Sequence, residues 1–246
     1  MCENLKLLKV RRFKQKPGQC AIAASASIAN FYDSKIDYDT AQYVATSITN
    51  GPIDFGLYSG EIGLLLNDLG FRKVSIISAE IDWLDFSWHD ISNATMIQNL
   101  KKVNRRFKPP FNLEIKSVIR FLSRKKNKNK LIVDFKHVDY IRKAIDDGLP
   151  VILSYAWTKV FKFAKCNQSG DTDPFRGDPD EHAVVVCGYD DEGAYILDSH
   201  NELYKGPLKK YSSGRYKMLW TDLMAVALEV TIPEDFSAKR GKYELV

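Results

Sequence analysis

Two apolar runs separated by a short polar turn set the main constraint on how this chain folds. The first run is HisAlaValValValCysGlyTyrAsp at 182–190, and the second is AlaTyrIleLeuAspSer at 194–199. The connection AspAspGluGly at 190–193 is polar and contains glycine, which is typical of a β-hairpin. Strands joined by such a turn are antiparallel neighbours, so the pattern predicts an antiparallel sheet.

The two halves of the chain differ in their pattern. In the second half, apolar runs predict strands over 131–135, 150–157, 216–220 and 226–232, and a short helix over 138–147. In the first half, apolar spacing and capping residues predict helices over 20–31, 39–47, 59–69 and 112–122, with one short strand over 73–77. Helices followed by strands favour an α+β fold, in which a helical N-terminal half packs on an antiparallel C-terminal sheet.

The length of 246 residues is compatible with one large domain. We expect a single domain over 1–246, with a helical half at 1–123, a sheet half at 131–232 and a C-terminal tail at 233–246. The segment 124–130, ArgLysLysAsnLysAsnLys, breaks all periodicity and predicts an exposed loop at the boundary between the halves.

Positive charge is concentrated in one stretch of the chain. Residues 101–130 hold twelve Lys or Arg and one acid, Glu114, so this stretch carries +11 and the remainder −6 of a net charge of +5. This charge lies within a basic insertion at about 84–130. The pattern favours a solvated, lysine-rich insertion, and a weak contact of 101–130 with a polyanion is the alternative.

Several classes of protein are disfavoured by the sequence. No run approaches 18 apolar residues, and the Lys- and Arg-rich start lacks the apolar segment of a secretory signal, so we expect a cytoplasmic protein without a membrane span. The four cysteines are too few for a disulfide scaffold and predict free thiols. No His or Cys pair has the spacing of a structural zinc site, and we expect neither a metal nor an organic cofactor.

A nucleophilic cysteine is the chemistry that the residues favour. Cys20 follows the turn residues Pro17 and Gly18 and opens a predicted helix, whose N–H groups and dipole lower the pKa of a thiol. His182 opens the first hairpin strand and Asp198 ends the second, so strand pairing brings them together and lets the carboxylate orient the imidazole. Gln15, five residues before Cys20, carries a side-chain N–H that can stabilise an oxyanion.

Taken together, these residues resemble the papain-like cysteine peptidases, especially the bacteriocin-processing peptidases that cleave double-glycine leaders. The similarity runs from about residue 13 to 230, and a weaker similarity links the segment around Cys20 to phytochelatin synthase. The matching stretches are GlnLysProGlyGlnCysAlaIleAlaAlaSer at 15–25, AspAspGlyLeuProValIleLeu at 146–153, the hairpin at 182–199 and TrpThrAspLeu near 220.

The resemblance implies a papain-like fold and a thiol peptidase or amidase acting on a peptide or protein. It implies Cys20 as nucleophile, His182 as general base, Asp198 as orienting acid and Gln15 as oxyanion donor. Relatives commonly have a glutamine six residues before the cysteine and a glycine directly after it. In this chain Gln15 lies five residues before Cys20, and the residue after Cys20 is Ala21. Gln19 is therefore a second candidate for the oxyanion donor.

Alternatives remain open at this point. The same fold serves acyl or peptidyl transfer, and an inactive papain-like protein would bind peptides or a polyanion instead. Asn201 rivals Asp198 as the residue that orients His182, and Cys2 next to Met1 invites a comparison with N-terminal nucleophiles. The acidic loop at 171–181 is either a solvated turn, a contact for basic substrates or a cause of a raised His182 pKa.

Overall fold

The fold is built on one sheet to which both halves of the chain contribute. The computed structural model describes residues 5–51, 53, 56–166, 172–177, 179–200, 209 and 211–237. Within these residues eight strands form a single sheet in the order β3-β2-β8-β4-β5-β6-β7, and β1 pairs with β5. The strands are β1 (Lys6–Leu7), β2 (Phe71–Ser78), β3 (Lys130–Val133), β4 (Val151–Ala156), β5 (Glu181–Tyr189), β6 (Gly193–Leu197), β7 (Arg215–Leu219) and β8 (Ala227–Phe236).

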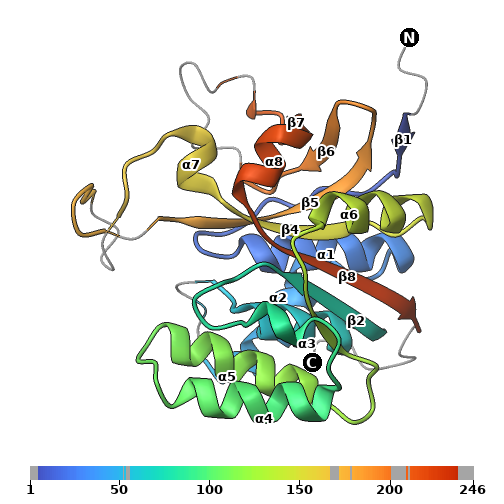
Figure 1. The fold of residues 1–246 in the computed structure, drawn as a ribbon. Coiled ribbons are helices and arrows are strands. Elements are labelled where there is room, and N and C mark those ends of the chain that lie inside the picture. The colour runs from blue at the N-terminus through green and yellow to red at the C-terminus, as the bar shows by residue number, and fades with distance from the viewer. Residues whose placement is uncertain are drawn as a thin grey trace.

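Helices cover both faces of this sheet (Figure 1). The helices are α1 (Cys20–Tyr32), α2 (Tyr38–Thr49), α3 (Ser59–Leu69), α4 (Asn93–Asn104), α5 (Phe111–Leu122), α6 (His137–Asp146), α7 (Trp157–Phe161) and α8 (Trp220–Val226), with a 3-10 turn η1 at Phe86–Trp88. Alternate residues of β5 face the two sides. Val185 joins the core under α1 to α5, whereas Val184 and Val186 join the core under α6 to α8. Because successive side chains of β5 point to opposite faces of the sheet, this one strand contributes to both cores.

The α+β prediction is confirmed, and the sheet is larger than the sequence pattern indicated. All predicted strands and helices are present, with bounds that shift by a few residues. β2 pairs antiparallel with β8 and parallel with β3, so the first half of the chain also enters the sheet. Because the sheet joins the two halves, we propose that they fold as one domain. β8 continues through Phe236, and residues 238–246 lie outside the described residues.

Helix α1 is the element that fixes the position of Cys20. The turn before it passes through Gly18, whose φ of 69° belongs to the left-handed region that glycine adopts without strain. Ten consecutive side chains from Ala21 to Asn30 are buried, most of them Ala or Ser. Small side chains allow α1 to lie close to β5, against which it packs. The sequence therefore seats the first residue of α1, Cys20, at the start of a helix held within the core.

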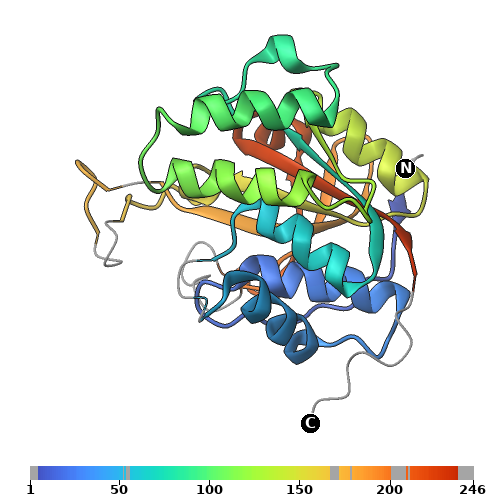
Figure 2. The same cartoon turned by 90° about the horizontal axis from the view of Figure 1, so that it is seen from below.

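The basic stretch is folded against the helical layer. It includes the end of α4, all of α5 and the first residue of β3. Helices α4 and α5 lie side by side (Figures 1 and 2), at the end of the molecule opposite β7 in the view of Figure 1. Arg124 makes a bidentate ion pair with Asp68 of α3, both atom pairs at 2.7 Å. Asn129 is buried and exchanges side-chain hydrogen bonds with Asn67 at 2.8 and 3.1 Å. The expected loop at 124–130 is thus only partly solvated.

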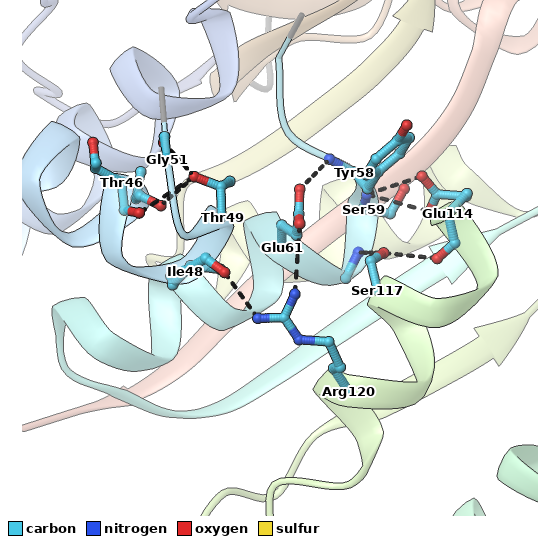
Figure 3. A network of polar contacts seen from close by, with 12 residues as sticks. Thr46, Ile48, Thr49, Gly51, Tyr58, Ser59, Glu61, Glu114, Ser117 and Arg120 are labelled. Carbon is cyan, nitrogen blue, oxygen red and sulfur yellow. Dashed lines mark hydrogen bonds and ion pairs between the residues drawn. The ribbon is translucent and has the colours of Figure 1, made fainter. Parts of the chain in front are cut away.

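Helix α5 also supplies partners for the first N–H groups of α3 (Figure 3). The carboxylate of Glu114 accepts from the backbone N–H of Ser59 at 3.2 and 3.3 Å, and the hydroxyl of Ser117 accepts from that of Gly60 at 3.1 Å. A Cβ on Gly60 would lie 2.1 Å from the backbone carbon of Ser117, so only glycine allows this approach. Two donors that a helix start leaves unpaired are satisfied by another helix.

Arg120 extends the same network to α2. Its guanidinium donates to the carbonyl of Ile48 at 2.9 Å and lies 3.7 Å from the carboxylate of Glu61. Glu61 in turn accepts from the backbone N–H of Tyr58 at 3.1 Å (Figure 3). Three helices are therefore tied together through one arginine of the basic stretch.

Candidate active site

Cys20 lies at the N-terminus of α1 with its thiol directed toward β5. Interactions with the side chain of His182 and with the backbone N–H groups of Ala183 and Ala21 lower the pKa of this thiol. Burial opposes ionisation of the thiol, but His182 and these N–H groups outweigh it, and the pKa of Cys20 lies below its ordinary value. The arrangement therefore favours a thiolate.

His182 is the second residue of β5 and is 5% exposed. Its Nε2 lies 2.8 Å from Oδ1 of Asp198, which leaves Nδ1 for the thiol of Cys20. Burial lowers the pKa of the imidazole, but the charge and hydrogen bond of Asp198 and the contact with Cys20 raise it to about 10. The two opposite shifts of Cys20 and His182 favour a thiolate–imidazolium pair.

Asp198 follows β6 and has no exposed surface. Besides His182, its carboxylate accepts from the backbone N–H of His200 at 2.8 Å and from the hydroxyl of Tyr216 at 3.0 Å. Its backbone is held as well, because the guanidinium of Arg12 donates to its carbonyl. These contacts place the carboxylate against the ring of His182. Asn201, the rival for this position, lies outside the described residues, as does Cys2.

The two candidate oxyanion donors differ in what their side chains already bind. The carbonyl oxygen of the Gln15 side chain accepts from the hydroxyl of Ser199 at 2.7 Å, which leaves its amide N–H groups for another acceptor. The side chain of Gln19 is bound at both ends, to the hydroxyl of Tyr38 at 2.5 Å and to the carbonyl of Ile53 at 3.5 Å. The geometry therefore favours Gln15 over Gln19.

A profile of the family described as "Peptidase_C39 like family" matches residues 7–227 of the chain. The chain belongs to the peptidase C39-like family. The match spans every residue of the proposed site, and the resemblance to this branch of the papain-like cysteine peptidases is confirmed. As a member of this family, the protein is a cysteine peptidase.

Two solved structures are similar to this C39-like peptidase. One is described as a C39-like peptidase from Bacillus anthracis, with 14% identity, a TM-score of 0.45, and coverage of 96% of this chain and 100% of the other. The second is xylellain, a cysteine protease from Xylella fastidiosa, with 14% identity, a TM-score of 0.47, and coverage of 94% and 86%. No curated protein matches the chain significantly.

Aromatic side chains pack against His182 in this C39-like peptidase, and the sequence did not predict these contacts. The ring centroid of Trp157 lies 5.8 Å from that of His182 and 6.0 Å from that of His200. The rings of Trp157 and His200 are nearly parallel, at 20°. Tyr155 lies edge-on to His182 at 5.9 Å. Trp157 and Tyr155 occupy the end of the strand predicted at 150–157, where an apolar pattern indicates burial but not a neighbour.

No described residue of the acidic loop before His182 is among the causes that raise the pKa of that residue. The charges that raise it belong to Asp198 and Cys20. Asp173 accepts from the backbone N–H groups of Phe175 and Arg176 at 3.1 and 2.9 Å, as a turn residue does. Asp171 and Asp178 lie outside the described residues. The contacts of Asp173 fit the reading of this loop as a solvated turn, and its other readings stay predictions.

Two features are absent from the part of this C39-like peptidase that the structure describes. No group of three or more His, Cys, Asp or Glu side chains there is arranged to hold a metal ion. None of the helices there has the length and apolar character needed to cross a bilayer.

Proposed function

We propose that this peptidase hydrolyses an amide bond of a peptide or protein with Cys20 as nucleophile, His182 as general base and acid, and Asp198 as the residue that orients the imidazole. One observation carries the proposal. Nε2 of His182 lies 2.8 Å from the carboxylate of Asp198, and the same imidazole interacts with Cys20 and lowers the pKa of its thiol. A nucleophile, a base and an orienting carboxylate in contact are what acyl transfer through a covalent intermediate requires.

The reaction follows from the protonation states of the pair. The thiolate of Cys20 attacks the carbonyl carbon of the substrate, and the carbonyl π electrons move to its oxygen. As the tetrahedral intermediate collapses, the imidazolium of His182 gives its proton to the leaving amine, and a thioester remains on Cys20. His182 then removes a proton from water, which attacks the thioester and releases the acid and the thiol.

The oxyanion of the intermediate needs donors, and two sources are at hand. Gln15 has amide N–H groups beyond the bond that its carbonyl oxygen makes to Ser199. The first N–H groups of α1, beside Cys20, are those that a helix leaves without intrahelical partners. We propose that Gln15 and the start of α1 stabilise the oxyanion together.

The test is peptide cleavage resolved by mass spectrometry. A peptide library derived from digested proteins should yield new termini with the wild-type chain and none with Cys20→Ala, which keeps the fold because alanine is smaller. Added hydroxylamine or a small thiol distinguishes hydrolysis from transfer, since transfer would give the adduct in preference to the acid. No cleavage and no adduct from any peptide, with a folded protein, would contradict the proposal.

A further inference from the structure

A row of phenolic hydroxyls lies behind the carboxylate of Asp198. Tyr216, at the start of β7, donates its O–H to Oδ2 of Asp198 at 3.0 Å. Oδ1 is the oxygen that accepts from Nε2 of His182 and from the backbone N–H of His200, both at 2.8 Å. The two oxygens of one buried carboxylate are therefore held by donors from different strands.

Tyr155 extends the row by one hydroxyl. Its phenol oxygen lies 3.2 Å from that of Tyr216. An ionised carboxylate can only accept hydrogen bonds, so the proton of Tyr216 is directed at Asp198. Tyr155 is then the donor in the pair of phenols. The row has one direction, from Tyr155 to Tyr216 to Asp198, and His182 meets the carboxylate from the other side.

Tyr155 also contacts His182 directly. The two residues are paired across β4 and β5, and their rings meet edge-on at 5.9 Å and 75°. Tyr155 has no exposed surface. The row therefore forms a closed circuit in which four neighbouring strands, β4 to β7, each contribute one side chain at or just beyond their end.

We propose that Tyr216 is a positioning residue that acts through Asp198: its hydroxyl keeps the carboxylate turned so that Oδ1 faces Nε2 of His182. Tyr155 supports this role by fixing the direction of the Tyr216 hydroxyl. The inference rests on the role proposed above for His182. Hydrogen bonds to an ionised group are the strong ones in a protein interior, so the loss of the bond to Oδ2 leaves the carboxylate free to rotate out of the orientation in which Oδ1 faces Nε2 of His182.

Among the described residues, the other groups that face Asp198 reach it independently of Tyr216. Arg12 reaches its carbonyl from the N-terminal arm, His200 follows it in the chain, and Cys20 of α1 lies beyond His182. A change at Tyr216 thus alters one donor to Oδ2 and leaves the charges around the site as they are.

The test is an NMR titration of the His182 ring in Tyr216→Phe. Loss of one bond to the carboxylate should lower the pKa of His182 by about one unit, a roughly tenfold weaker preference for imidazolium. The alkaline limb of the Cys20 alkylation profile should move down by the same amount. Tyr195→Phe is the matched control, because Tyr195 donates to Oδ2 of another buried carboxylate, that of Asp190, at 2.8 Å. It should leave the titration of His182 unchanged.

Two outcomes overturn the proposal: a His182 titration in Tyr216→Phe that matches or exceeds that of the wild type, and an equal downward shift in Tyr195→Phe. Tyr155→Phe is a second test. It should weaken the preference of His182 for the imidazolium form about threefold, in the same direction as Tyr216→Phe. If Tyr216→Phe fails to fold, an unshifted titration in Tyr155→Phe overturns the proposal instead. The titration requires no substrate, so absence of peptide cleavage would count against the proposed function and not against this role of Tyr216.

Discussion

Ser199 and Gln15 hold each other by two hydrogen bonds although they are 184 positions apart in the sequence. The Ser199 hydroxyl donates to Oε1 of Gln15 at 2.7 Å, and the backbone N–H of Gln15 donates to the Ser199 carbonyl at 3.3 Å. Ser199 directly follows Asp198, so the N-terminal arm is fastened next to the proposed orienting acid. The amide of Gln15 is oriented by this bond rather than left to the turn around Pro17.

Gln15→Ala should therefore lower kcat by about 10²–10³-fold, the usual cost of one oxyanion donor. Gln19→Ala should change kcat little, because the Gln19 side chain is already bound to Tyr38 and Ile53. Steady-state kinetics on a peptide found by library cleavage would measure both. The opposite ranking would move the oxyanion role to Gln19.

Alkylation by iodoacetamide at pH 6 should modify Cys20 before the other thiols. An ordinary thiol is ionised to well under 1% at this pH, so an ionised Cys20 should react about 10–100-fold faster after allowance for its lower nucleophilicity. Cys187 is buried, and burial raises its pKa to about 11. Peptide mapping after timed labelling gives each rate, with Cys166 as the half-buried reference. Equal rates, or no slowing in His182→Ala, would contradict activation by His182.

Asp198→Asn should narrow the pH range of the ion pair from its alkaline side. The charge of Asp198 supports the imidazolium of His182, whose pKa it helps to raise to about 10. An amide keeps the ring in place without that charge, so the alkaline limb of the alkylation profile should move toward neutral pH. An unchanged limb in Asp198→Asn, together with a collapse in Asn201→Ala, would assign the orienting role to Asn201.

Glu229→Gln should stabilise the fold at alkaline pH. Burial raises the pKa of Glu229 from 4.5 to about 7, and the charges of Glu181 and Glu80 add to this shift. Hydrogen bonds to Ser59 and Ser78 oppose it. Between pH 4.5 and 7 the unfolded chain releases a proton that the folded chain retains. The free energy of unfolding therefore falls as pH rises through this range, and the contribution of this group is constant above pH 7. The variant should gain on the order of 2 kcal/mol at pH 8 and nothing near pH 4.

Urea unfolding at the two pH values measures this gain. Glu192→Gln, which removes a charge from a largely exposed side chain, is the control and should not show the same pH dependence. A Glu229→Gln variant that is no more stable than the wild type at pH 8 would show that the buried carboxylate does not oppose folding.

The basic stretch should bind polyanions weakly. Arg120 and Arg124 are engaged by Ile48, Glu61 and Asp68, so they are not available to a partner. We expect elution from heparin at ionic strength below physiological, since each contact with an anionic group of the polymer adds only a salt-sensitive increment. Charge reversal at Lys125, Lys126 and Lys128, which are exposed, should leave Cys20 labelling intact. Tight retention that this reversal abolishes would establish a polyanion site.

The sequence predicted the parts of the site that depend on strand pairing and helix starts. A hairpin brings residues at the ends of its strands together, so His182 and Asp198, which are 16 positions apart in the sequence, lie 2.8 Å from each other. The turn at Pro17 and Gly18 likewise predicted that Cys20 begins a helix. Both inferences rest on local rules that this chain obeys.

The remainder depends on contacts between distant segments, which a local pattern does not contain. Tyr216 and Trp157 lie in apolar runs that predict burial, yet nothing in those runs indicates that one reaches Asp198 and the other His182. Helix α4 went unpredicted because only Met96 and Leu100 are buried along it, too few for a helical period. β1 is two residues long and exists through its pairing with β5.

The way α5 completes the start of α3 limits how this enzyme can be shortened. An engineer who replaced residues 84–129 with a brief linker would remove Glu114 and Ser117 and expose the N–H groups of Ser59 and Gly60. Gly60 would then destabilise the first turn of α3 through its low helix propensity. With the backbone of Ser117 removed, a larger side chain would also fit at this position. A minimal version of the peptidase therefore needs a new cap at position 58 and a substitution of Gly60, made together with the deletion.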